Sequence, residues 1–153
     1  MKPAYVYAIL GLALDQWLKY FIGKHQTLLG GGVFRYYLNY NFAWSWPVAN
    51  RLVVILTLVL LAALAFVCFR FRPGRGHWLA LAWLASGALS NLIDRIWRGG
   101  VADYIPLPGG AVINLADLFI FSGIILLLIK PWDYAGENGF LRPGGIRRRR
   151  GDD

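Results

Sequence analysis

Four long runs of apolar residues divide the chain, at about 3–22, 48–69, 78–94 and 112–130. Each run is close to the roughly 20 residues that an α-helix needs to cross a bilayer core. The pattern therefore predicts an all-α integral membrane protein with four transmembrane helices. The first run contains Asp15 and Lys19 and lacks a small-residue cleavage site, so we interpret it as a retained helix.

Two connections between these runs are long enough to hold structure. Residues 34–40 alternate between apolar and polar side chains, a period of two that predicts a β-strand, and Gly30–Gly32 supply a turn before it. Residues 95–111 contain Pro106, Pro108, Gly109 and Gly110, so we expect a loop there. Both connections lie on the same side of the predicted helices, where they would form a small β-strand and loop platform.

The composition agrees with a membrane protein. Hydrophobic residues make up 58% of the chain and charged residues 16%, against about 45–50% and about 25% in soluble proteins. The net charge is +8, but a nucleic-acid binder carries its basic patch on a soluble body. The composition argues against a soluble enzyme and against a nucleic-acid partner, and favours membrane lipids as the surroundings.

The distribution of Lys and Arg predicts the orientation. With four helices, the side that holds both termini collects ten of the 16 basic residues, and the other side six. The positive-inside rule therefore places both termini in the cytoplasm. We expect residues 1–130 to form the membrane domain and 131–153 to be a basic, disordered cytoplasmic tail, in which Arg147–Arg150 more plausibly mark topology than bind a specific lipid.

Acidic residues are few, and half of them lie within or beside the predicted helices. The four are Asp15, Asp94, Asp103 and Asp117. A rise of 1.5 Å per residue places Asp15, Asp117 and Asp94 about 18, 20 and 26 Å from the cytoplasmic ends of their helices. All four therefore converge near the outer edge of the membrane. Ionisable groups at this depth are costly and usually mark function.

Helical spacing separates these acids into two kinds. Lys19 lies four residues after Asp15, and Arg95 follows Asp94, so both acids have a local cation. Asp103 and Asp117 have no basic residue within four positions. Two such carboxyls close together in a low-dielectric site share a proton. The ionised one can then activate water while the protonated one polarises a carbonyl.

Other chemistries fit less well. The predicted topology places His25 and His77 on opposite sides of the membrane, so no zinc site can be assembled, and we expect no metal and no cofactor. A Ser–Lys dyad that uses Lys19 stays open as a minor alternative. A second class, a small proton- or ion-coupled transporter or a non-enzymatic lipid-binding protein, is disfavoured because the inner half of every predicted helix is apolar.

Four motifs in sequence resemble one known family. They are LDQWLKY (14–20), LNYNFAWS (38–45), GALSNLIDRIWRGGVADYI (87–105) and INLADLFI (113–120). In order and spacing they are similar to the motifs of lipoprotein signal peptidase, signal peptidase II, over residues 3–130. The resemblance implies a bacterial inner-membrane aspartic endopeptidase with its active site toward the periplasmic face. Such an enzyme removes the signal peptide of a diacylglyceryl-modified prolipoprotein by cleaving before the lipidated cysteine.

The resemblance also assigns roles to residues. The catalytic pair falls on Asp103 and Asp117, the same two acids that lack local cations. The substrate-binding or supporting positions are Asp15, Lys19, Asn39, Asn91, Asp94, Arg95 and Asn114. The partner implied is a lipidated prolipoprotein, and a globomycin-type peptide inhibitor and a monomeric enzyme are further expectations.

Several supporting residues have more than one interpretation. We favour an orienting ion pair for Asp15 with Lys19, and a scaffold or substrate-carbonyl clamp for Asp94 with Arg95. The three asparagines could join helices or contact substrate, and the 34–40 strand is more plausibly a substrate-docking platform than a plain hairpin. Two departures from the family are Asn41-Phe42 after Asn39, which adds bulk beside the expected substrate strand, and Ser90 in place of the usual glycine.

Overall fold

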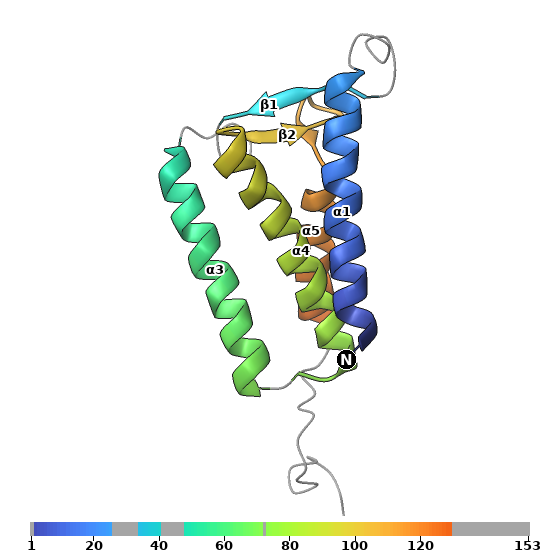
Figure 1. Ribbon diagram of the computed structural model, residues 1–153. Coiled ribbons are helices and arrows are strands. Elements are labelled where there is room, and N and C mark those ends of the chain that lie inside the picture. The colour runs from blue at the N-terminus through green and yellow to red at the C-terminus, as the bar shows by residue number, and fades with distance from the viewer. Residues whose placement is uncertain (1, 26–33, 41–47, 72, 130–153) are drawn as a thin grey trace, which may run out of the picture.

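The computed structural model describes residues 2–25, 34–40, 48–71 and 73–129. This part of the chain is mostly helical, as predicted, and each apolar run contains one long helix (Figure 1). The helices are α1 (Lys2–Lys24), α3 (Asn50–Phe71), α4 (Arg75–Trp97) and α5 (Leu115–Ile129). The predicted tail at 131–153 and the unusual Asn41-Phe42 pair lie outside the described residues.

Helix α4 is the centre of the bundle. It packs against α5, α1 and α3, and the helices run side by side over most of their length (Figure 1). Two glycines allow α4 and α5 to approach closely: a Cβ atom at Gly123 would lie 2.8 Å from the carbonyl oxygen of Ala80, and one at Gly87 would clash with the carbonyl of Ala116. Small residues at such contacts are typical of helices that pack in membranes.

A two-stranded sheet covers the end of the bundle that lies away from the N-terminus (Figure 1). Strand β1 (Tyr37–Asn39) pairs antiparallel with β2 (Val101–Asp103), with Tyr37 opposite Asp103 and Asn39 opposite Val101. The strand predicted over 34–40 is therefore confirmed at its centre but is only three residues long. Its pairing brings Asn39 and Asp103, which are far apart in sequence, to the same end of the molecule.

The second connection differs from the expected loop. Besides β2 it holds a hairpin of β3 (Ile105–Pro106) and β4 (Val112–Ile113), with Ile105 opposite Ile113. Gly109 and Gly110 have φ angles of +97° and +90° and form the turn, a conformation that suits glycine. Proline and glycine correctly indicated a turn, but strands of two or three residues are too short to show an alternating pattern. The fourth helix consequently begins at Leu115, later than the predicted residue 112.

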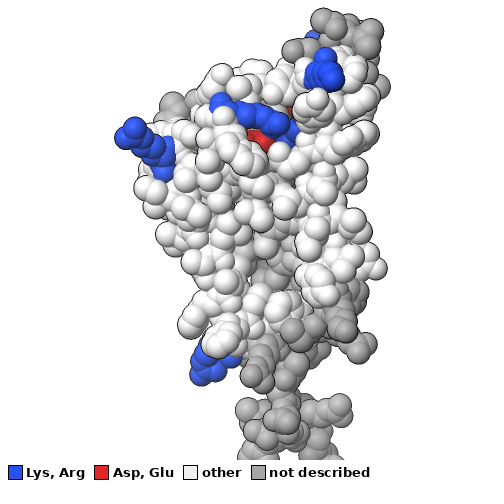
Figure 2. Space-filling view, in the orientation of Figure 1, with Lys and Arg blue, Asp and Glu red and all other residues white. Residues whose placement is uncertain are grey.

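Of the described helices, only α3 is both long and apolar enough to cross a membrane by length and composition, and α5 is apolar with 15 residues. Helices α1 and α4 contain charged side chains, but Asp15, Lys19 and Asp94 are buried against other helices. The outward surface is apolar instead, with Ile9 and Val59 each 61% exposed. Figure 2 shows a broad uncharged band between Lys and Arg side chains at the two ends of the visible face. The charged groups in the middle of α1 and α4 therefore lie inside the bundle, among buried apolar side chains such as Leu84 and Leu92, while the outward surface is apolar.

Candidate active site

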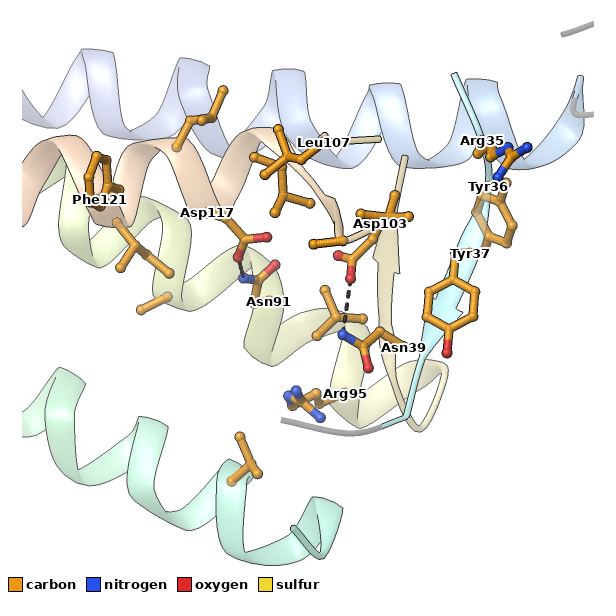
Figure 3. A pocket seen from close by; sticks show the side chains of 18 of the residues that line it. Arg35, Tyr36, Tyr37, Asn39, Asn91, Arg95, Asp103, Leu107, Asp117 and Phe121 are labelled. Atoms are coloured by element: carbon orange, nitrogen blue, oxygen red, sulfur yellow. Dashed lines mark hydrogen bonds between the residues drawn. The ribbon is translucent and has the colours of Figure 1, made fainter. Parts of the chain in front are cut away.

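Two of the four aspartates face a common cavity. Asp103 is the last residue of β2, and Asp117 lies in the first turn of α5. Their carboxyl groups come from separate elements and point toward the same space between α4, α5 and the sheet (Figure 3). The cavity has a volume of about 1230 Å³. The predicted convergence of Asp103 and Asp117 is thus what the folded chain displays.

Asparagine side chains hold the Asp103 carboxylate. Asn39 Nδ2 donates to Oδ2 over 3.1 Å, and Asn114 Nδ2 donates to Oδ1 over 2.7 Å. Burial, and then the nearby negative charge of Asp117, raise the pKa of Asp103 to about 7, although both hydrogen bonds oppose the shift. A carboxyl with this pKa can be protonated or ionised near neutral pH.

Asp117 is fixed by two donors of its own. Asn91 Nδ2 donates to Oδ1 over 2.8 Å, and the backbone N–H of Asn114 donates to Oδ2 over 3.1 Å. In return, Asn114 Oδ1 accepts from the backbone N–H of Asp117 over 2.9 Å. This reciprocal arrangement is a capping box, which satisfies N–H groups that the first helical turn leaves open. Asn114 therefore caps α5 with its oxygen and contacts Asp103 with its nitrogen.

The other two aspartates belong to a buried ion cluster. Lys19 Nζ lies 2.7 Å from Asp15 and 2.9 Å from Asp94, and Arg98 pairs with the second carboxylate oxygen of Asp94. The predicted Asp15–Lys19 pair is confirmed. For Asp94, however, the cations in contact are Lys19 and Arg98 in place of the predicted Arg95. The physical reason is that adjacent residues on a helix point in different directions, whereas residues four apart share a face.

The ion cluster is connected to the carboxylate pair through one amide. Lys19 Nζ donates to Asn91 Oδ1 over 3.0 Å, and Asn114 Nδ2 also reaches this oxygen, at 3.2 Å. With Oδ1 held by two donors, the Nδ2 group of Asn91 is directed toward Asp117. Asn91 and Asn114 therefore join separate segments of the chain, as one of the two interpretations expected, and they do so by contacting the carboxylates.

Arg95 lines the cavity without being part of the ion cluster. Its Nη1 donates to Asn50 Oδ1 over 3.1 Å, and Asn50 Nδ2 donates back to the carbonyl oxygen of Arg95. Asp103 and Asp117 are the acids whose charges act most strongly on it. The guanidinium is thus held at the cavity wall near the carboxylate pair (Figure 3), where it can face a bound ligand.

Several residues of this layer were missed from the sequence. Ser90 was noticed only as a departure, yet its hydroxyl donates to Asp15 Oδ2 and accepts from Gln16 Nε2 over 2.8 Å. Arg98 could have been found, because it lies four residues after Asp94. The sequence did not indicate a role for Tyr104 or Asn50, because the residues to which they hydrogen-bond are distant in sequence.

The cavity is polar at one end and apolar at the other. Its polar end holds the carboxylate pair, and its other end is lined by apolar side chains of α3 and α5, among them Leu60, Phe121 and Ile124. No group of three or more potential metal ligands occurs among the residues that the structure describes. The site can therefore hold an extended polar segment next to two carboxyls, with an apolar segment below.

A helical bundle with two carboxyls that face one cavity is the arrangement expected of a membrane aspartic peptidase. The sequence matches the family Signal peptidase (SPase) II over residues 7–132. A lipoprotein signal peptidase of Moorella thermoacetica is 34% identical over 146 residues, which cover 90% of this chain and 97% of the relative. That of Microcystis aeruginosa is 35% identical and covers 85% and 92%, and that of Caldicellulosiruptor bescii is 32% identical and covers 81% and 83%.

A solved structure described as a bacterial membrane enzyme has the same fold, with a TM-score of 0.74 and 23% identity over 84% of this chain and 87% of that one. The chain belongs to the signal peptidase II family, whose members are aspartic peptidases. This membership confirms the resemblance carried by the four motifs. It favours a peptidase over the transporter and lipid-binding alternatives.

Proposed function

We propose that this protein removes the signal peptide of lipid-modified prolipoproteins, cleaving before the lipidated cysteine, with Asp103 and Asp117 as the catalytic pair. The observation that carries the proposal is that these two carboxyls, held by separate asparagine donors, face one cavity of about 1230 Å³. The three relatives above are named for this activity.

The surroundings of the two carboxyls suggest a division of roles. Asp103, with its pKa raised to about 7 by burial and by the charge of Asp117, can carry the proton of the pair near neutral pH. Asp117 lies at the N-terminus of α5, where the helix dipole and an N–H donor favour negative charge. Asp117 accepts a proton from water as the water oxygen attacks the scissile carbonyl carbon. Asp103 donates its proton to the carbonyl oxygen, which gives a neutral tetrahedral intermediate. The C–N bond then breaks as the leaving nitrogen takes the proton that Asp117 received from water, and the re-forming carbonyl returns its proton to Asp103.

The shape of the cavity suits a substrate with an apolar flank. The polar end, with Asn39 and Arg95 on its walls, would hold the extended peptide around the scissile bond, and β1 would serve as its docking platform. The apolar end, at Leu60 and Phe121, would receive a hydrocarbon segment of the signal peptide or the diacylglyceryl group. A globomycin-type peptide would compete for the same space.

We further propose that all four helices span the bacterial inner membrane, with both termini in the cytoplasm and the catalytic layer at the periplasmic side. The burial of the charges of α1 and α4 inside the bundle supports this, because their outward faces are then apolar. Every group assigned to the catalytic layer comes from one chain, so a monomer is sufficient.

The test is cleavage of a purified, diacylglyceryl-modified prolipoprotein by the full-length protein in detergent or proteoliposomes. Asp103→Asn and Asp117→Asn should each reduce the rate by at least about 10³-fold, because a general acid or base is lost. Neither variant should melt at a lower temperature than the wild type. If both still cleave at the wild-type rate, or if a chelator abolishes cleavage by the wild type, the proposed mechanism is wrong.

A further inference from the structure

The first turn of α5, which carries Asp117, is capped by three different parts of the chain. The backbone N–H groups of a first helical turn have no partner within the helix. Here the N–H of Leu115 donates to the Tyr104 hydroxyl over 3.1 Å, and the N–H of Ala116 donates to Asp15 Oδ1 over 3.1 Å. The N–H of Asp117 donates to Asn114, as described above. The position of this helix end is therefore set by side chains from outside α5 as well as by its own cap.

Tyr104 joins two of these contacts. Its hydroxyl accepts from Leu115 and also donates to Asp15 Oδ1 over 3.1 Å. The side chain is only 1% exposed. Burial and the adjacent charge of Asp15 raise the pKa of Tyr104 above its ordinary value, so the hydroxyl keeps the proton that it donates.

Tyr104 is also directly connected to β2, the strand that carries Asp103. Tyr104 follows Asp103 in the chain, and its backbone N–H donates to the carbonyl oxygen of Ile113 over 2.9 Å. Through its backbone and its side chain, Tyr104 thus connects the end of β2 to the residues on both sides of the Asn114 cap. An aromatic ring with few rotatable bonds makes this connection stiff.

We propose that Tyr104 is a positioning residue, which sets the separation of Asp103 and Asp117 by holding the end of β2 against the N-terminus of α5. The inference rests on the catalytic pair proposed above. Tyr104 is not among the residues that line the cavity, so it acts through the two carboxyls and not through contact with substrate. Misplacement of catalytic groups by about 1 Å can cost up to about 10²-fold in rate.

Ser90 provides a matched comparison. Its hydroxyl donates to the other carboxylate oxygen of Asp15, but it lies on α4 and connects α1 to α4 only. Removing either hydroxyl takes one hydrogen bond from Asp15. Only the removal of the Tyr104 hydroxyl also takes away the partner of the Leu115 N–H at the N-terminus of α5. A purely structural role would make the two substitutions equivalent.

The experiment compares Tyr104→Phe, Ser90→Ala and the wild type in the cleavage assay, with rates normalised to folded protein. Tyr7→Phe, at an exposed position of α1, is the control for the chemical change. We expect both buried variants to lower the melting temperature. Tyr104→Phe should reduce kcat about tenfold with KM unchanged, whereas Ser90→Ala should retain most of its kcat.

Three results would overturn the proposal: a wild-type kcat in folded Tyr104→Phe, an equal loss of kcat in Ser90→Ala, or a change confined to KM. Should Tyr104→Phe not fold, Leu115→Pro removes the N–H end of the contact together with the leucine side chain, at a helical position that accepts proline, and it should also lower kcat; Leu115→Ala, which keeps the N–H, is its control. Wild-type kcat in Leu115→Pro would contradict the proposal. Full activity of Asp103→Asn would instead contradict the catalytic pair, so the two failures can be told apart.

Discussion

Four aspartates occupy one layer of this bundle, and they form two pairs with opposite surroundings. The buried acid pair, Asp15 and Asp94, shares Lys19 between its members, and Arg98 completes the cluster. Among the residues that the structure describes, the cavity acid pair, Asp103 and Asp117, has only neutral donors in hydrogen-bond contact, and it opens to a large cavity. The residue type and the depth are the same, so the role of each aspartate follows from its counter-ions and its access to ligand.

The comparison explains why the cavity acid pair is suited to chemistry. A carboxylate saturated by cations is a poor proton acceptor, because its ionised form is already stabilised. Neutral amides leave a carboxyl free to titrate, as the pKa of about 7 for Asp103 shows. The buried acid pair instead neutralises charges inside the bundle and, through Lys19 and Asn91, orients the donor to Asp117.

The largest expected effect is on thermal stability, and it should differ between a substitution in the buried acid pair and one in the cavity acid pair. Asp15→Ala leaves the ammonium of Lys19 with one fewer counter-ion in a site where Lys19 is 1% exposed. Breaking a buried ion pair from one side costs about 3–5 kcal/mol. The melting temperature in detergent should therefore fall sharply. Asp103→Ala, which removes a carboxyl at the cavity wall, should not lower it, and an equal loss in both variants would contradict the distinction.

The next effect is on the pH dependence of cleavage. If Asp103 must be protonated, the rate should fall about tenfold per pH unit once the pH exceeds about 7. Asn39 stabilises the ionised form of Asp103, so Asn39→Ala should move this alkaline limb to higher pH. The measurement is kcat against pH for both proteins. A limb that does not move, or moves to lower pH, would argue against Asp103 as the titrating group.

The raised pKa of Asp103 also has a consequence for stability. Between its ordinary value of 3.8 and about 7, the folded protein binds a proton that the unfolded chain has released. The contribution of Asp103 to the free energy of unfolding must therefore decrease as the pH rises through this window. In Asp103→Asn that part of the pH dependence should disappear, which thermal melts at several pH values can measure.

The smallest expected effect concerns the apolar end of the cavity. Leu60→Trp would occupy space beside Phe121 and should raise KM for a lipidated substrate about tenfold, with kcat little changed. Leu56→Trp is the matched control, because Leu56 lies on the same helix, is exposed on the bundle surface and does not line the cavity. If the two substitutions changed KM equally, the apolar end of the cavity would not be part of the substrate-binding site.

Much of this arrangement could be predicted from the sequence, because helical periodicity is local information. The positions of the helices follow from the apolar runs, and the i,i+4 spacing of Asp15 and Lys19 gave their ion pair. Because no basic residue lies near Asp103 or Asp117 in the sequence, these two acids were correctly distinguished from Asp15 and Asp94. Four motifs in order then identified the family.

Other features depend on contacts between distant segments. The β3–β4 hairpin is too short for an alternating pattern, so the region was expected to be a loop. Asp94 could form its second ion pair only when α1 packed against α4 and brought Lys19 to it. The hydroxyls of Ser90 and Tyr104 meet on Asp15, which is 75 and 89 residues away from them. No local rule predicts such a meeting.

The central claim is that the cavity acid pair holds a titrating proton. Infrared spectroscopy of the carboxylic C=O stretch, followed against pH in the purified protein, measures this directly. We predict a protonated band that fades as the pH rises through about 7, is absent in Asp103→Asn, and fades at lower pH in Asp117→Asn, where the neighbouring charge is gone. A band that persists in Asp103→Asn would contradict the account.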